Sequence, residues 1–371
     1  MTCRACRAPG QAGDVVLDLG LAPAADYFPL PTDPLPDPAF DLSMWCCPAC
    51  GLAQLTVDES DTSEPRAVEP EALRLQANDA VSALAAAGLL AGRRTVGEFG
   101  SPHGGSWLNL FADQGLDPVS PDAVADVVVD SFGLMHAPDQ RAAIHERVEM
   151  LSDSGVLVLQ FHSVEAIVGE RQWNALRHGH FAYYSLSSLI PLLASVGLTP
   201  DRAWEFDLYG KTVMVTATRS AAGSAHPPAG GRQDPTVQVI LKREAELSLT
   251  QPDSLRTLQS GADLETTQLG NAIRAKAKKG RRVFAYGAAS RAVALLSRAG
   301  LTAQELLAVG DASPSKHGRT MPGTRIPIIG PQELVSADPD EVLLLLPDLL
   351  PELLQSLPQL AGRWKLPPYA S

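Results

Sequence analysis

The cysteines of this chain are confined to its first fifty positions. All five lie in two short segments, Cys3-Arg-Ala-Cys6 and Cys46-Cys47-Pro-Ala-Cys50. Two Cys-x-x-Cys turns can present four thiolates to one tetrahedral zinc ion. We therefore predict a structural zinc site at Cys3, Cys6, Cys47 and Cys50, with no coordination position left for a substrate. Cys46 falls outside the tight turn and is expected to be packed or free.

Two other chemistries are open to the same cysteines. Two disulfides would require an oxidising compartment, and the first residues do not resemble a signal peptide. A redox Cys-x-x-Cys pair would sit between a strand and a helix, which neither pair is expected to do. Zinc is favoured over both, so the zinc domain is a scaffold and the function lies in the rest of the chain.

The charge balance narrows the range of partners. The chain has 30 basic and 42 acidic residues, which give a net charge of −12. A nucleic-acid partner is disfavoured because neutralising phosphates requires clustered Lys and Arg. No apolar run reaches the ~20 residues that span a bilayer. We expect a cytoplasmic protein that acts on a small molecule, without a nucleic-acid or membrane partner.

The middle of the chain alternates between strand and helix patterns, which predicts an α/β fold. An amphipathic helix over 70–90 precedes a strand over 94–99, a Gly-rich turn and a helix from Trp107. This order is typical of a nucleotide-binding unit, although glycines also occur in such turns for packing reasons. Further elements are expected at 125–130 (strand), 140–151 (helix), 152–155 (turn), 156–161 (strand), 186–196 (helix), 203–208 and 212–218 (strands).

A second α/β pattern begins after a Ser/Gly/Pro-rich boundary at 220–234 and a polar helical region. It contains a strand over 282–286, the turn Gly287-Ala-Ala-Ser290, a helix to Ala299, a strand over 307–310 and a buried run over 341–346. Lys316 and Arg319 lie on a loop after one of its strands. A cationic pair at that edge suits phosphate, and solvated surface charge is the alternative.

Seven short motifs follow one another along the chain. They are Cys47-Pro-Ala-Cys50-Gly-Leu52, Glu98-Phe-Gly-Ser101, His136-Ala-Pro-Asp139, His178-Gly-His180 with the aromatic residues to Ser185, Tyr286-Gly-Ala288, Lys316-His-Gly-Arg319 and Pro322-Gly-Thr324. In this order they resemble the family of S-adenosylmethionine-dependent sugar C-methyltransferases, which act on nucleotide-linked deoxysugars in antibiotic biosynthesis. The resemblance covers nearly the whole chain.

The resemblance implies a domain order. It implies an N-terminal zinc-binding domain over 1–62, a shortened Rossmann-like methyltransferase domain over 68–220, a linker and helical region over 221–279, and a second Rossmann-like domain over 280–371. The central domain would hold the methyl donor. The C-terminal domain would hold the nucleotide part of a nucleotide-linked sugar.

The resemblance also implies roles for single residues. His180 would be the base beside the keto group, His136 would face it near the donor, and His178 and Tyr183 would belong to the same site. A histidine satisfied inside the core is the alternative for both His136 and His180. The donor would contact Glu98, Gly100, Ser101, Gly104 and the possible relic of an acidic turn, Asp117. The substrate would contact Tyr286, Gly287, Ser290, Lys316, Arg319 and Lys211.

The chain departs from the family in its donor half. Only 21 residues separate Gly104 from Asp126, whereas a complete βαβ unit needs about 30. The segment has room for one helix and one turn, and the missing part carries the ribose acid and the adenine loop. Where the family has Tyr-His-Glu-His, this chain has Arg177-His178-Gly179-His180. The use of S-adenosylmethionine therefore stays open.

Three functions remain after this reading. The first is methyl transfer to a carbon next to a keto group. The second is a repurposed relative that keeps His136 and His180 but uses no methyl donor, as an isomerase, epimerase or cyclase. The third is a non-catalytic protein that stabilises a partner.

Overall fold

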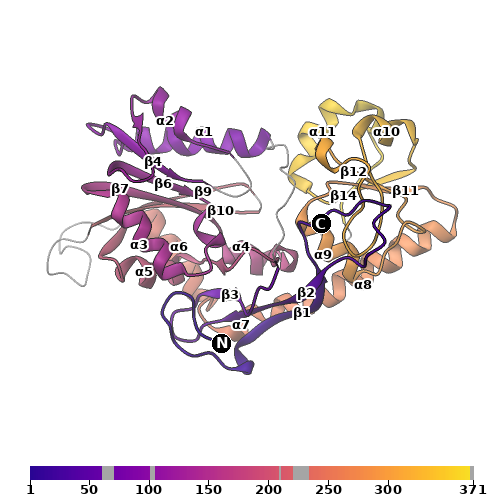
Figure 1. Ribbon diagram of the computed structural model, residues 1–371, viewed down its shortest axis with the longest axis horizontal. Helices are drawn as coiled ribbons and strands as arrows, with labels where there is room; N and C mark the ends of the chain where they lie inside the picture. Colours follow the sequence, from indigo (N-terminus) through magenta and orange to yellow (C-terminus); the bar gives the residue numbers. More distant parts are fainter. Residues whose placement is uncertain (61–70, 101–104, 209, 220–233, 368–371) are drawn as a thin grey trace.

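The protein folds around three β-sheets (Figure 1). The computed structural model describes residues 1–60, 71–100, 105–208, 210–219 and 234–367. Ser101 and Gly104, two of the predicted donor contacts, lie outside the described residues. Within the described part, no helix is both long and apolar enough to cross a membrane.

The N-terminal sheet is antiparallel and has the order β1-β2-β3-β8. Its strands are β1 (Val15–Pro23), β2 (Ala39–Cys46), β3 (Ala53–Leu55) and β8 (Ala182–Tyr183), and a 3-10 turn, η1 (Ala12–Asp14), precedes them. The last strand comes from the central part of the sequence, where Ala53 pairs with Tyr183 and Gln54 with Ala182. The zinc-binding region and the His178–Ser185 block therefore share one sheet.

The central sheet has the order β5-β4-β6-β7-β10-β9. Its strands are β4 (Thr95–Phe99), β5 (Asp117–Pro118), β6 (Ala125–Ser131), β7 (Leu151–His162), β9 (Leu198–Phe206) and β10 (Thr212–Arg219). The first four are parallel, and β10 runs antiparallel to both β7 and β9. The predicted turn over 152–155 is wrong, because the ladder to β6 absorbs these residues in a register shift inside β7.

The short segment between Gly104 and Asp126 contains one helix and one very short strand, close to the helix and turn that its length predicts. It forms α2 (Leu108–Asp113) and the two-residue strand β5. Asp117 pairs with Thr95, the first residue of β4, so it lies at the amino end of that strand. The ligand edge of a parallel sheet is the carboxyl end, which places Asp117 on the wrong side for the predicted donor contact.

Helices cover both faces of the central sheet (Figure 1). On one face, α1 (Glu71–Ala86) and α2 pack with Val127 and Val129. On the other face, α3 (Gln140–Met150), α5 (Leu186–Ala194) and α6 (Pro235–Glu246) pack with Val128. The alternation follows from the two-residue period of a strand, and apolar residues on both faces are typical of buried parallel strands.

The C-terminal sheet is parallel, with the order β13-β12-β11-β14-β15. Its strands are β11 (Val283–Tyr286), β12 (Val309–Gly310), β13 (Ile328–Ile329), β14 (Glu341–Leu344) and β15 (Trp364–Lys365). The helices around it are α9 (Ser290–Arg298), α10 (Pro331–Ser336) and α11 (Leu350–Ser356). The predicted class, α/β with a second Rossmann-like domain, is confirmed.

The helical region between the two α/β domains packs on both of them. α6 contacts α5 and β9 of the central domain, while α8 (Thr257–Lys278), which follows the short α7 (Pro252–Leu255), contacts β1, α9 and β11. β1 itself packs against α7, α8 and α9, so the N-terminal sheet contacts the helical region and the C-terminal domain. The domain limits taken from the sequence stay a prediction.

A buried ion pair fixes the turn that follows β6. The Asp130 carboxylate accepts hydrogen bonds from the amides of Gly133 (2.6 Å) and Leu134 (2.9 Å) and from Arg147 Nε (2.8 Å). Burial raises the pKa of Asp130, and the Arg147 charge opposes that rise. Arg147 also stacks on Phe99, with 4.1 Å from its guanidinium carbon to the ring centroid. The pair thereby positions η2 (Leu134–His136), which carries His136.

We expect Arg147→Met to lower the free energy of unfolding by about 3–5 kcal/mol, because it leaves the Asp130 charge buried without its partner. Denaturant titration followed by circular dichroism measures the change. Arg141→Met, at an exposed position of the same helix, is the matched control and should change stability by no more than about 0.5 kcal/mol. Equal effects of the two substitutions would contradict the role of the pair.

Candidate active site

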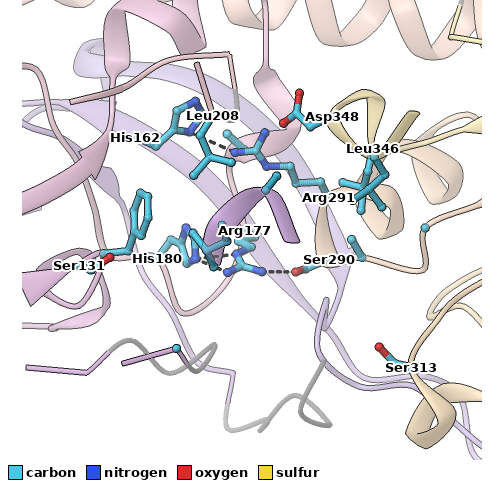
Figure 2. A pocket seen from close by; sticks show the side chains of 18 of the residues that line it. Ser131, His162, Arg177, His180, Leu208, Ser290, Arg291, Ser313, Leu346 and Asp348 are labelled. Carbon is cyan, nitrogen blue, oxygen red and sulfur yellow. Dashed lines mark hydrogen bonds between the residues drawn. The ribbon is translucent and has the colours of Figure 1, made fainter. Parts of the chain in front are cut away.

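A cavity of about 300 Å³ lies between the central and C-terminal domains (Figure 2). The central domain lines it with the turn after β4, with η2, with the end of β7 and with the loop before β8. The C-terminal domain lines it with the turn from β11 to α9 and with residues after β12 and β14. Its position at the carboxyl ends of parallel strands is where open α/β sheets bind ligands, and its size is at the lower end of the ~300–1,000 Å³ found for ligand pockets.

Two of the predicted catalytic histidines meet in this cavity. The rings of His136 and His180 both line it, with centroids 4.4 Å apart and planes nearly perpendicular at 89°. His136 Nδ1 lies 2.9 Å from the carbonyl oxygen of Gly179. Because a carbonyl only accepts, Nδ1 carries a proton. The two rings therefore face one cavity and do not point into separate parts of the protein.

Tyr183 also lines the cavity, but its hydroxyl is fully engaged by the backbone. It donates to the carbonyl of Ala175 (3.2 Å) and accepts from the amide of Arg177 (3.1 Å). Burial raises the pKa of Tyr183. The phenol therefore stays protonated at neutral pH and acts here as a brace for the loop that carries His180.

His178 points away from the cavity. It is buried, with Nε2 3.4 Å from the carbonyl oxygen of Asp41 and its ring edge-on to Phe40 at 5.9 Å. The chain reverses at Gly179 (φ +79°), whose amide donates to the Asp58 carboxylate (2.6 Å). The structure thus separates His178 from His180, and His178 anchors the loop to β2.

Arg177 is a site residue to which the sequence analysis gave no role. Its Nε lies 2.7 Å from His180 Nε2, a second guanidinium nitrogen contacts the same atom, and a third interaction joins it to Ser290 Oγ in the C-terminal domain. Arg177 stands where the family's Tyr-His-Glu-His motif has its tyrosine, and this position beside His178 and His180 was the feature of the sequence that could have identified it as a site residue. Arg291, on α9, makes a similar contact with a histidine, since it lies 3.1 Å from His162 Nδ1 (Figure 2). It also lies 3.3 Å from Gln172 Oε1.

The predicted donor contacts are divided by the structure. Glu98 lines the cavity, and its carboxylate accepts hydrogen bonds from the Trp107 amide and the Ser106 hydroxyl, both at 2.6 Å, which ties the end of β4 to the residues just before α2. Gly100 lines the cavity too, and a Cβ placed there would meet no atom of the described residues within 4 Å. Asp117 is not among the described residues that line it.

The predicted substrate contacts are divided as well. Tyr286, Gly287 and Ser290 line the cavity. Lys316 lines it but is buried, donates from Nζ to the carbonyl of Ala288 (2.9 Å) and lies 4.5 Å from the centroid of the Phe28 ring.

Arg319 and Lys211 lie outside the set of described cavity residues. The Arg319 guanidinium donates to the carbonyls of Ser315 (3.0 Å) and Phe28 (2.7 Å), so it ties a loop to the N-terminal region. Lys211 pairs with Glu165 (3.4 Å) and Glu205 (3.5 Å). Their charges are used by the protein itself, which places both predicted contacts away from the ligand cavity.

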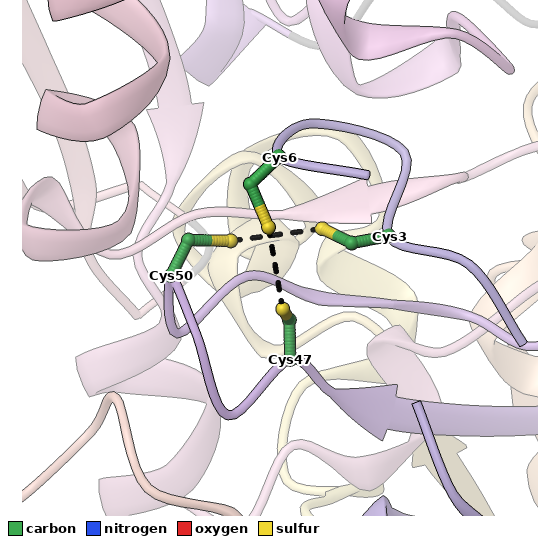
Figure 3. Close-up of side chains that lie close together, drawn as sticks. All are labelled: Cys3, Cys6, Cys47 and Cys50. Carbon is green, nitrogen blue, oxygen red and sulfur yellow. Dashed lines mark hydrogen bonds between the residues drawn. The ribbon is translucent and has the colours of Figure 1, made fainter. Parts of the chain in front are cut away.

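The four predicted zinc ligands converge on one point (Figure 3). Their sulfur atoms all lie within 4.8 Å of one another, and the Cys3–Cys50 and Cys6–Cys47 separations are 3.6 Å. Four sulfurs at ~2.3 Å around a tetrahedral zinc are about 3.8 Å apart, which this cluster matches. Cys46 is buried outside it, 3.7 Å from the carbonyl of Gly51, and burial raises the pKa of its thiol to about 12.

Short contacts connect the thiol cluster to β8 and to the loop before it, which carries His180. Gln54 donates to Cys3 Sγ (3.3 Å), accepts from the amide of Arg4 (2.9 Å) and pairs with Ala182 across the β3–β8 ladder. The amide of Leu55 donates to the carbonyl of Phe181 (3.2 Å). The metal site therefore holds the strand that ends the His178–Tyr183 segment.

These features define an α/β protein with a four-cysteine zinc-binding domain and a cavity between two Rossmann-like domains. A family model described as a putative zinc binding domain matches residues 3–61, and one described as a C-methyltransferase C-terminal domain matches residues 208–365. C-methyltransferase NovU of Streptomyces niveus is 26% identical over 245 residues, which cover 66% of this chain and 57% of that protein. The two family models and the match to NovU support the membership in the sugar C-methyltransferase family that the motifs predicted.

Solved methyltransferase structures are similar to part of the chain. Magnesium protoporphyrin IX methyltransferase of Synechocystis, with bound SAH, is 13% identical with a TM-score of 0.30 and covers 40% of this chain and 84% of that one. The 1,6-didemethyltoxoflavin-N1-methyltransferase of Burkholderia thailandensis is 17% identical with a TM-score of 0.29 and covers 46% and 96%. The fold assignment rests on the three sheets described above.

We expect Cys50→Ser to reduce zinc from about one ion per chain to a small fraction of that, because a closed site needs all four thiolates. Loss of the ion should also speed amide hydrogen exchange at 182–183, the two residues that pair with β3. Elemental analysis and hydrogen-exchange mass spectrometry measure the two effects. Cys46→Ser is the control and should keep the zinc. Zinc loss in both variants, or unchanged exchange after zinc loss, would contradict this link.

Proposed function

We propose that the protein transfers a methyl group from S-adenosylmethionine to a carbon beside a keto group, on a nucleotide-linked sugar. The observation that carries the proposal is the placement of His136 and His180 in one cavity between the two α/β domains. Family membership supports it, and the relative NovU is named a C-methyltransferase. The aligned part spans 57% of that relative, so the activity and substrate of this chain are inferred.

The described cavity residues fit one end of the methyl donor. A Cβ at Gly100 would meet no described atom within 4 Å, and Glu98 holds the residues just before α2, so the amino-acid end could approach the backbone of Gly100 closely. Among the described residues that line the cavity, no carboxylate comes from β5 to bind the ribose, since Asp117 lies at the other end of the sheet. When bound, the donor supplies an electrophilic methyl group on a sulfonium sulfur.

The protein's own residues supply the proton chemistry. A histidine within hydrogen-bond reach of a carbon next to a ketone can take its proton, since its unperturbed pKa of ~6.5 lies near neutrality. The negative charge that develops on the keto oxygen would be stabilised by the positive electrostatic potential that Arg177 and Arg291 give to the cavity. Phe99, Met135 and Leu346 in the lining reduce access of water to the reacting atoms.

The C-terminal domain offers the site for the nucleotide part of the substrate. Tyr286 ends β11, and Gly287 follows in a left-handed conformation (φ +101°), where a Cβ would lie 3.2 Å from the Leu346 side chain. Ser290 begins α9 beside them. A turn of this type brings backbone amides close to a ligand at the carboxyl end of a parallel strand.

A second candidate is favoured by the shortened donor half. A relative that keeps the histidine pair but binds no methyl donor would move a proton as an isomerase, epimerase or cyclase. The position of Asp117 at the amino end of β4 is the observation in its favour. Donor binding separates the two candidates.

We expect S-adenosylmethionine and its demethylated product to bind and to raise the thermal unfolding temperature, since ligand at 100 times its dissociation constant stabilises by about 2.7 kcal/mol. Isothermal calorimetry and thermal unfolding measure this. Glu98→Gln should weaken binding, because it loosens the turn, while Asp117→Asn should leave it unchanged. Absence of both heat and stabilisation would remove methyl transfer and leave the second candidate.

His180→Ala should lower turnover by about 10²–10⁴-fold, which is the usual contribution of a general base. The assay follows nucleoside diphosphate-linked keto-deoxyhexoses with and without the donor by mass spectrometry. His145→Ala, at an exposed position on α3, is the control and should retain activity. Full activity of the His180 variant would exclude His180 as the base.

A further inference from the structure

The nitrogen that His180 needs as a base is held by Arg177. Two guanidinium nitrogens of Arg177 contact His180 Nε2, one of them at 2.7 Å. An arginine side chain is always protonated in proteins and has no acceptor, so it donates in both contacts. His180 Nε2 must therefore be the lone-pair nitrogen, and its lone pair points at Arg177.

This arrangement prevents His180 from taking a proton while Arg177 stays in place. A neutral imidazole has one acceptor nitrogen, and the same lone pair is required to bind a proton. In addition, a second positive charge beside the guanidinium is electrostatically unfavourable. The base becomes active only if Arg177 leaves Nε2.

The surroundings of Arg177 indicate what draws it away. Its third contact is to Ser290 Oγ, at the start of α9 in the C-terminal domain, so the side chain already spans the cavity (Figure 2). Arg291, which follows Ser290 on α9, brings a second guanidinium to the cavity from the C-terminal domain. Two forked cations in one cavity suit a phosphate or diphosphate, which forms stronger, charge-assisted hydrogen bonds than a neutral imidazole or hydroxyl does.

We propose that Arg177 is a positioning residue that withholds His180 until the anionic group of the substrate takes its guanidinium. This inference rests on the proposed function, because it assigns an order to binding and proton removal at the same site. Once Arg177 has moved to the anion, the C–H bond next to the ketone breaks, its proton passes to His180 Nε2, and its electron pair passes to the keto oxygen as an enolate. A sugar that lacks the anionic group would leave the base held.

Nuclear magnetic resonance of histidine rings in protein labelled with ¹⁵N tests this without turnover. Inorganic pyrophosphate is the probe, and His180→Gln assigns the resonance. In the wild-type protein, saturating pyrophosphate should shift the ¹⁵Nε2 resonance of His180 toward the position of a neutral histidine whose Nε2 accepts no hydrogen bond from an arginine. In the Arg177→Gln variant, the His180 resonance should already have this position without pyrophosphate and should not shift when pyrophosphate is added. The variant should also bind pyrophosphate at least about tenfold more weakly.

Two further variants separate gating from a merely structural bridge. Arg291→Gln should weaken pyrophosphate binding but leave the starting resonance of His180 unchanged. Arg319→Gln removes an arginine outside the described cavity lining and should behave as wild type in both measurements. If Arg177→Gln unfolds, Arg177→Lys, which keeps the charge without the fork, should show a partly released His180.

The gating inference would be overturned if pyrophosphate binds by calorimetry without moving His180, if it fails to bind, or if His180 has the same resonance with and without Arg177. The proposed methyl transfer is tested separately by donor binding and by turnover. If the protein binds no donor but pyrophosphate still releases His180 from Arg177, the proposed methyl transfer is contradicted and the role of Arg177 is supported. If the donor binds but pyrophosphate does not release His180, only the role of Arg177 is contradicted.

Discussion

The pairing of β3 with β8 is the contact on which the candidate site depends. It is a ladder of two residue pairs, Ala53–Tyr183 and Gln54–Ala182, and it joins the thiol cluster to the segment that carries the histidines. On one side, Gln54 donates to Cys3 Sγ. On the other, the loop before β8 holds His180 against His136. Two short strands are weak alone, so the metal and the surrounding core must supply their stability.

The trimmed central sheet keeps the edge that faces the ligand. β4 and β6 still end at the cavity, with Glu98 fixing the turn into α2 and Asp130 fixing η2 through Arg147. The shortening falls at the outer edge, where β5 has only two residues. The loss therefore affects the side of the cleft that would hold the ribose, while the histidine side and the C-terminal wall remain built. This asymmetry explains why the motifs around the histidines and in the C-terminal domain match the family, while the part that would bind the ribose of the donor does not.

The sequence predicted the parts of the protein that depend on local pattern. The four-thiol cluster followed from Cys-x-x-Cys spacing, and β6 was visible as an apolar run because both of its faces are buried. Long-range consequences were not predictable in this way. Lys211 and Arg319 looked available for a ligand, yet each is used by groups distant in sequence, such as Glu165 and the Phe28 carbonyl. The contact of Arg177 with Ser290 likewise depends on where α9 packs, far along the chain.

The borrowed strand β8 also sets the order in which the molecule can mature. The N-terminal sheet is complete only after the first four strands of the central sheet have been synthesised, because β8 follows them in the chain. Such non-local pairing adds loop-closure entropy and slows folding. Until β8 arrives, β3 presents an open edge, which is a hazard for association with other chains. On a ribosome, early capture of the metal by the first fifty residues would shield this nascent half from misassembly while the rest of its sheet is still being made.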